Sequence, residues 1–181
     1  MSFIKRQSPG RIIALGFAMV ILVGSLLLIL PCSIQDGVTV RYVDALYTST
    51  SAVCVTGLIA IDAGTTFTPL GQFFLALLIQ IGGLGVTAVG AGIMLAMGRK
   101  VNLKGRNIIR EAMNLNSGRG LVSFVKDIFI TTLVIELAGA VLSFTVFAGD
   151  YPPLKAAGIS LFHSVAAFNN SGFDILEIFK T

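Results

Sequence analysis

Residues 44–58, DALYTSTSAVCVTGL, are the stretch that decides the fold predicted for this chain. Tyr47, Ser51 and Ala52 lie at helical spacing, so a short helix is expected over the first part. The run Ala-Val-Cys-Val-Thr-Gly that follows contains small and β-branched residues and ends in glycine. The stretch is too short and too polar to cross a bilayer, although apolar segments of membrane-spanning length flank it.

A half-spanning helix followed by an extended segment is typical of a filter that selects cations. Non-helical backbone at membrane depth is tolerated only where it is buried in protein or lines a water-filled path. The carbonyl oxygens of such a segment replace the water around a cation, and glycine permits backbone angles that turn them inward. An ordinary extracellular loop is the alternative interpretation of this stretch alone.

A second copy of the stretch lies at residues 159–173, ISLFHSVAAFNNSGF, and aligns without gaps at an offset of 115 residues. An internal repeat indicates a repeated architecture. The unit predicted here is a membrane helix, a half-helix, a filter strand and a second membrane helix. The matched positions carry identical or related residues: Leu46 with Leu161, Tyr47 with Phe162, Ser49 with Ser164, Ala52 with Ala167, Thr56 with Ser171, Gly57 with Gly172, and Asp62 with Glu177.

Four motifs are shared with a known family. They are SPGR at 8–11, AVCVTGL at 52–58, LIQIGGLG at 78–85, and FHS at 162–164 together with AFNNSGF at 167–173. In these motifs the chain resembles the membrane subunit of the Ktr/Trk/HKT superfamily of potassium transporters, and most of all the bacterial Ktr type. The family has four such repeats in one polypeptide, whereas this chain holds about one and a half.

The filter is expected to bind the ion through backbone carbonyls. Half-helices at 44–52 and 159–167 are expected to aim their negative C-terminal ends at the ion. In the family resembled, glycine at the position of Gly57 accompanies potassium permeation and serine accompanies a sodium preference. The expected ion-binding residues are Val53, Cys54, Val55, Thr56, Gly57, Phe168, Asn169, Asn170, Ser171 and Gly172.

The composition predicts an all-α membrane protein. Of the 181 residues, 55% are hydrophobic and 12% are charged, and the mean hydropathy is +0.89. Three transmembrane helices are expected, at about 12–30, 70–97 and 121–148. The pattern GxGxxA at 83–88 also occurs in dinucleotide-binding folds, but inside a membrane-length apolar run it indicates close helix packing or a kink.

Three regions are predicted: a first helix–pore–helix repeat at 1–97, a basic cytoplasmic loop at 98–120, and an incomplete second repeat at 121–181. Nine Lys or Arg residues fall on the N-terminus and the 98–120 loop, against three on the opposite side. The positive-inside rule therefore predicts a multi-pass protein of the inner (plasma) membrane, with a cytoplasmic N-terminus and filters that open outward.

Other polar residues have two interpretations each. Glu136, near the middle of the third span, is expected to face protein, with ion coordination as the alternative. His163 is expected to be a hydrogen-bonded structural residue more than a proton sensor. Gln80 suits either helix–helix bonding or pore lining, and Cys54 either a small filter residue or a reactive pore thiol. Acidic residues that either concentrate cations at the mouth or serve as caps and solvated charges are Asp36, Asp44, Asp62, Asp150, Asp174 and Glu177.

The predicted function is that of the pore-forming subunit of a potassium uptake system, without covalent chemistry and without a cofactor. The alternative is a truncated, non-conducting chain that associates with full-length subunits. Neither paired carboxylates nor a metal-ligand cluster lies in the spans, so an enzyme is not expected, and neither is nucleic-acid binding. The resemblance implies a homodimer, a cytoplasmic nucleotide-binding regulatory subunit, and sodium as a coupling ion, while the spans imply membrane lipid as a partner.

Overall fold

The computed structural model describes residues 9–96, 109–110 and 120–176, and these are almost entirely helical. Two helices are long: α1 (Pro9–Leu28) and α7 (Leu121–Phe147). Two of intermediate length, α2 (Tyr42–Val53) and α8 (Pro153–Phe168), each follow one of them. Between these pairs lie α4 (Pro69–Leu84) and α5 (Val86–Ala96), and the remaining elements are short: η2 (Pro31–Ser33) and α3 (Ala63–Thr66).

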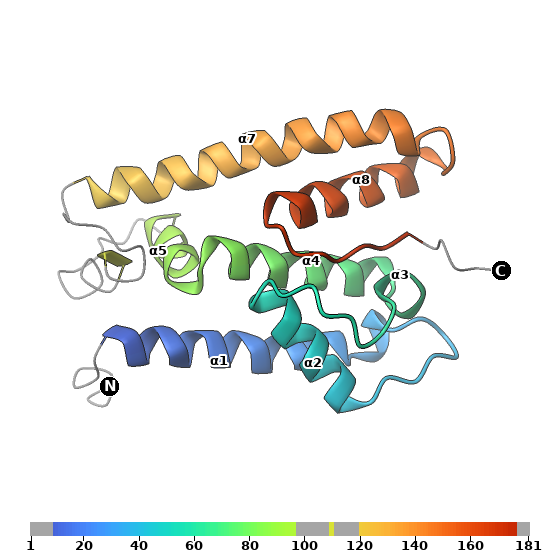
Figure 1. The fold of residues 1–181 in the computed structure, drawn as a ribbon, viewed down its shortest axis with the longest axis horizontal. Coiled ribbons are helices and arrows are strands. Elements are labelled where there is room, and N and C mark those ends of the chain that lie inside the picture. Colours follow the sequence, from blue (N-terminus) through green and yellow to red (C-terminus); the bar gives the residue numbers. More distant parts are fainter. Residues whose placement is uncertain (1–8, 97–108, 111–119, 177–181) are drawn as a thin grey trace.

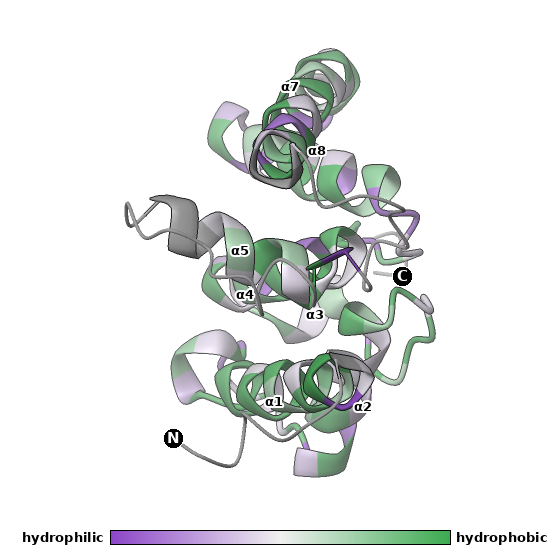
Figure 2. Cartoon of the chain, turned by 90° about the vertical axis from the view of Figure 1, so that its left-hand side faces the viewer, coloured by the Kyte–Doolittle hydropathy of each residue, from purple (hydrophilic) through white to green (hydrophobic). Residues whose placement is uncertain are grey.

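The helices stack in three layers, with α1 and α2 in one, α4 and α5 in the middle, and α7 and α8 in the third (Figures 1 and 2). Within the outer layers, α2 packs on α1 and α8 packs on α7. The middle helix α4 contacts α1, α2 and α8. The element α4 is therefore the common neighbour of both shorter helices.

Among the residues that the structure describes, two helices are long and apolar enough to cross a bilayer. The windows Gly10–Leu28 and Ser123–Phe147 have mean hydropathies of 2.4 and 2.0. Only 17% and 11% of these windows are buried inside the protein, as expected for helices that face lipid. Hydrophobic residues predominate along the helices (Figure 2), and many large ones are exposed, among them Met19 on α1 and Leu142 on α7. Long apolar helices with exposed outer faces identify a membrane protein.

The span expected at 70–97 is bent in the structure, since the chain turns by 100° between Pro69–Leu84 and Val86–Gly92. The bend falls at Gly85, whose φ of 85° and ψ of 132° are accessible only to glycine. Three spans are present only if this bent pair counts as one. The kink itself lies in the glycine-rich segment for which a kink or close packing was predicted.

The predicted filter strands are wrong as regular β structure. In the described residues the only β pairing is an isolated bridge between Ile34 and Phe67. The segments that follow α2 and α8 are irregular, since residues with positive φ interrupt them. The half-helices are also longer than predicted, and α8 begins six residues earlier, at Pro153 instead of 159.

Candidate functional site

The two shorter helices end in the same way. After α2, the Thr56 amide donates to the Ser51 carbonyl and the Val55 amide donates to that of Ala52. After α8, the Ser171 amide donates to the Ala166 carbonyl and the Asn170 amide donates to the Ala167 carbonyl. These two bonds join the equivalent positions of the second copy, at the offset of 115 residues. This pair of bonds defines a Schellman motif, in which the residue after the cap adopts a left-handed conformation.

The left-handed residue of each motif is not glycine. Val55 and Asn170 both have a φ of 53°. Asparagine tolerates this region, whereas a β-branched residue in it is strained by about 1–2 kcal/mol. Sequence reasoning placed the conformational freedom at Gly57 and Gly172, and these also have positive φ, at 68° and 72°. Each turn therefore contains two left-handed residues, which rules out a regular strand there.

Each helix is fixed to the preceding long helix by an equivalent contact. Ser49 Oγ on α2 donates to the Ile21 carbonyl of α1 at 2.8 Å. Ser164 Oγ on α8 donates to the Glu136 carbonyl of α7 at 2.6 Å. Both bonds join residues 28 positions apart. A glycine on the long helix, Gly24 or Gly139, makes room for the serine, since a Cβ there would lie 2.6 or 2.5 Å from the serine Oγ. These two glycines also stand at the 115-residue offset, a signal that the sequence analysis missed.

The two turns lie against each other at their glycines. A Cβ placed on Gly57 would be 2.8 Å from the Ser171 carbonyl oxygen and 3.2 Å from the Gly172 Cα. A Cβ placed on Gly172 would be 3.1 Å from the Gly57 Cα. Segments 115 residues apart in sequence are thus brought into backbone contact, and neither position has space for a side chain.

The backbone carbonyls of this site have no hydrogen-bond donor in the described part of the chain. In the described part of the chain, none of the ten backbone carbonyls of the predicted filter residues accepts a hydrogen bond. Unpaired carbonyls at the end of a helix carry its partial negative charge. Two adjacent turns of this kind form a local group of acceptors suited to a desolvated cation.

The side chains of the predicted filter residues point to different environments. Val53 is 1% exposed, and its carbonyl oxygen occupies the space that a Cβ on Gly82 of α4 would take. Cys54 is exposed, whereas its counterpart Asn169 reaches α4 and donates from Nδ2 to Gln80 Oε1 at 2.8 Å. Gly82 and Gly83 of α4 therefore pack against the first and the second turn, respectively. The sequence motif alone did not indicate these contacts.

The second turn contains a buried hydroxyl that has no partner within the described ranges. In the first turn Thr56 Oγ1 donates to Ser51 Oγ at 3.0 Å. The residue equivalent to Ser51 in the second copy is Ala166, so Ser171 Oγ has nothing to bond in the described residues although Ser171 is fully buried. The two copies are therefore similar in backbone and different in side-chain bonding.

Glu136 and Gln80 lie together beside the second turn. Glu136 is 7% exposed, and its Oε1 has no partner among the described residues. Glu136 and Gln80 both line a mainly apolar cavity of about 640 Å³ between α4, α7 and α8, together with Thr132 and Gln72. Glu136 faces protein, as the sequence predicted.

His163 makes the same kind of hydrogen bond as Thr48, its counterpart in the first copy. Thr48 Oγ1 donates to the Asp44 carbonyl four residues earlier, and His163 Nδ1 lies 2.8 Å from the Ile159 carbonyl, again four residues earlier. The imidazole packs against the Phe147 and Phe162 rings at centroid distances of 5.5 and 5.9 Å. These contacts favour the structural interpretation of His163, although Nε2 is buried and without a partner among the described residues.

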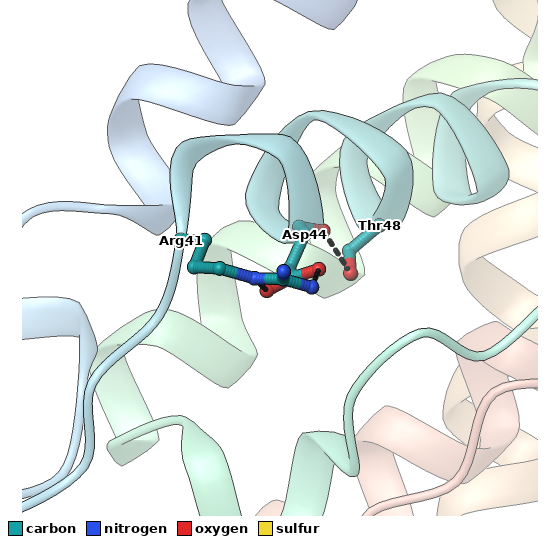
Figure 3. Close-up of polar contacts among 3 residues, drawn as sticks. All are labelled: Arg41, Asp44 and Thr48. Atoms are coloured by element: carbon teal, nitrogen blue, oxygen red, sulfur yellow. Dashed lines mark hydrogen bonds and ion pairs between the residues drawn. The ribbon is translucent and has the colours of Figure 1, made fainter.

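Three of the acidic residues are engaged locally. Asp44, at the start of α2, accepts two bonds from the Arg41 guanidinium at 2.8 and 2.9 Å (Figure 3). This bonding lowers the pKa of Asp44. Asp62 caps α3 by accepting from the Gly64 and Thr65 amides, and Asp174 accepts from the Leu176 amide. The interpretation as caps and paired charges is favoured for these three.

Two sequence predictions lie mainly outside the described residues. Of the basic residues in the 98–120 loop, only Arg110 is described, and it is exposed. Glu177 is also outside the described part. The described residues include no cluster of three or more His, Cys, Asp or Glu side chains able to hold a metal ion.

Comparison with known proteins places the chain among transporters. Residues 14–177 match the model of the TrkH family, described as cation transport protein. Ktr system potassium uptake protein B of Bacillus subtilis is 38% identical over 94% of this chain. Potassium/sodium uptake protein NtpJ of Enterococcus hirae is 38% identical over 95% of it, and Ktr system potassium uptake protein D of Bacillus subtilis is 36% identical over 95%. The chain spans 38% of the length of each of these three relatives.

Proposed function

Since this chain belongs to the TrkH family of cation transport proteins, we propose that its two matched helix ends are parts of a potassium-selective filter. The filter residues are 53–57, which begin at the last residue of α2, and 168–172, which begin at the last residue of α8. Each segment is the pore loop of one helix–pore-loop–helix repeat. The region 1–97 is the first repeat, 121–181 is the second and incomplete repeat, and 98–120 is the loop between them. Transport through such a filter involves no covalent step, in agreement with a family of transporters and not of enzymes.

The observation that carries this proposal is the contact between the two turns. Gly57 and Gly172 approach within the distance that excludes a Cβ, and the carbonyls around them accept no hydrogen bond in the described residues. A dehydrated cation needs several oxygen ligands at once, and helix C-terminal ends add favourable potential. Two such turns supply part of a ring of ligands, so further turns of the same kind complete the filter.

Potassium is the ion favoured here. Two of the relatives are named as potassium uptake proteins and one as a potassium/sodium uptake protein. The glycine at position 57 is the second support, because its bare Cα is what allows the two backbones to approach. Sodium is the proposed coupling ion, and the only support for it is the resemblance to the Ktr type of transporter.

The protein is proposed to lie in the inner (plasma) membrane with its N-terminus and the 98–120 loop in the cytoplasm. The excess of Lys and Arg on these segments supports this orientation. A homodimer and a cytoplasmic nucleotide-binding regulatory subunit are the proposed partners, and the basic loop suits an acidic partner surface or the anionic leaflet. The competing proposal is a non-conducting chain that assembles with longer subunits. It is supported by the fact that the chain spans 38% of the length of the Bacillus subtilis relative.

Uptake measurements test the proposal directly. The protein is expressed from its complete reading frame in a bacterium that lacks potassium uptake, and is also purified into liposomes with an inside-negative potential. We expect growth at low potassium and a potassium flux that exceeds the sodium flux. A correctly inserted protein that passes neither ion would exclude the filter and favour the non-conducting alternative.

A further inference from the structure

One side chain of the second turn reaches across to the middle helix. Asn169 Nδ2 donates to Gln80 Oε1 on α4 at 2.8 Å, and it also donates to the Val165 carbonyl of α8 at 2.9 Å. An amide nitrogen carries two hydrogens, so both are used. The bond to Val165 joins residues four positions apart, whereas the bond to Gln80 joins residues 89 positions apart. The carboxamide of Asn169 therefore connects the end of α8 to a helix of the first repeat.

The face of α4 that receives Asn169 has a defined shape. Gln80 and Gly83 are three residues apart in one helix, so they lie on the same face of it. A Cβ on Gly83 would collide with Asn169 Oδ1 and would lie 2.9 Å from Asn169 Cβ. Because the Asn169 Cβ is fixed to the backbone, rotation of the carboxamide alone would not make room for a side chain at position 83. The bond to Gln80 is therefore accompanied by a close fit against the backbone of α4.

The first turn has the same backbone conformation but lacks this bond. Cys54 and Asn169 both stand directly after a helix, with φ and ψ of −86° and −2° for Cys54 and of −82° and −2° for Asn169. The Cys54 side chain is exposed, and the first turn approaches α4 with its backbone, where the Val53 carbonyl lies against Gly82. Since cysteine adopts this conformation as well as asparagine does, the turn itself does not require the carboxamide. The role of the Asn169 side chain lies in its contact with α4.

The second turn is held at both of its ends by the first repeat. At one end Asn169 is bonded to Gln80. At the other end Gly172 lies against Gly57, so that a Cβ on Gly172 would be 3.1 Å from the Gly57 Cα. Only two residues separate these contacts. A segment this short has few conformations left once both ends are fixed, and the two contacts together therefore set the directions of its carbonyls.

We propose that Gln80 is a positioning residue for the second turn of the filter: its side-chain oxygen holds Asn169 and so fixes the carbonyls of 169–171 toward the ion. This inference rests on the proposed filter function. Gln80 acts through Asn169 and does not contact the ion itself. A helix of the first repeat thus contributes to ion preference at a turn of the second.

The test measures the potassium-to-sodium uptake ratio in liposomes for variants of the complete protein. Gln80→Met removes the acceptor and keeps an unbranched side chain of similar length. Asn169→Cys removes the donor and introduces the residue that the first turn carries. Each variant should lower the ratio by about two- to tenfold, the factor that corresponds to the loss of one hydrogen bond. The double variant should lower it no more than Asn169→Cys alone, because Gln80 then has no carboxamide to hold.

Gln72→Met is the matched control. Gln72 lies on the same helix, is half-buried as Gln80 is, and lines the same cavity, but its Nε2 donates to the Phe67 carbonyl at 3.2 Å. Gln72→Met should therefore keep the ratio of the unaltered protein. A general loss of folded protein lowers both fluxes together, so the ratio separates a positioning role from a purely structural one.

Three results would overturn the inference while the unaltered protein still transports potassium and the proposed filter stands. Gln80→Met keeps the ratio, Gln72→Met lowers it as much as Gln80→Met does, or the effects of Gln80→Met and Asn169→Cys add in the double variant. Should Gln80→Met fail to insert, Asn169→Cys decides: a lowered ratio supports the role of the bond, and an unchanged ratio contradicts it. An unaltered protein that passes neither ion contradicts the proposed function, and the inference fails with it.

Discussion

Substitution of Gly57 by serine is the sharpest perturbation of the proposed filter. Gly57 has a φ of 68°, and a Cβ there would lie 2.8 Å from the Ser171 carbonyl oxygen. Backbone atoms surround the position on the side of the second turn, so no flexible side chain is available to yield. The added side chain therefore has to separate the two turns.

The magnitude has two parts. A non-glycine residue in the left-handed region costs about 1–2 kcal/mol. In addition, the separation from the Ser171 oxygen has to grow from 2.8 Å to an ordinary contact of 3.4 Å or more. If a displacement of this size weakens potassium binding relative to sodium by about 1–2 kcal/mol, the uptake ratio changes by about 5–30-fold.

The assay measures potassium and sodium uptake by liposomes that contain the complete protein, for the unaltered form and for Gly57→Ser. Gly37→Ser is the matched control, because Gly37 has a φ of 81° and open space around its Cβ position. It shares the backbone strain and lacks the collision. We expect a lower potassium-to-sodium ratio for Gly57→Ser only. An unchanged ratio in Gly57→Ser, or an equal fall in Gly37→Ser, would refute the reasoning.

Three further outcomes are expected. Val55→Asn should raise the free energy of unfolding by about 1 kcal/mol, since asparagine tolerates the left-handed region better than valine. Thermal unfolding in detergent measures this change, and an unchanged stability would contradict the backbone strain assigned to Val55. Asp62→Ala should lower the free energy of unfolding by about 0.5–2 kcal/mol because the cap of α3 is lost, whereas Asp62→Asn should lower it less in the same assay. Replacing Lys104, Arg106 and Arg110 by glutamine should weaken co-purification of a cytoplasmic partner, and unaffected co-purification with correct insertion would leave these charges a topological role only.

Most of the architecture was predictable because it depends on local pattern. Apolar runs of membrane length gave the long helices near 12–30 and 121–148, observed as Pro9–Leu28 and Leu121–Phe147. The gapless offset of 115 residues located both shorter helices and their similar ends. Family membership followed from the same short motifs, and the comparisons confirm it. Whether the ten filter residues bind an ion stays a prediction.

The sequence did not indicate which of several similar residues has which role. The 78–85 motif contains three glycines, and only in the structure does Gly85 carry the bend while Gly82 and Gly83 pack against the two turns. A glycine-rich pattern indicates that another backbone can approach closely or that φ can be positive. It does not indicate which segment of the chain packs against each glycine. The same holds for Val55, whose left-handed conformation runs against its own preference.

The sequence by itself determined the repeat, the membrane character and the positions of both helix ends, because these follow from hydropathy and from bonds between residues at most five apart. Only the tertiary structure decided that the turns meet at Gly57 and Gly172, and that Asn169 bonds Gln80 across 89 positions. The physical reason is that such contacts depend on how α2, α4 and α8 pack. A single residue's preference contains no information on a partner that packing brings to it.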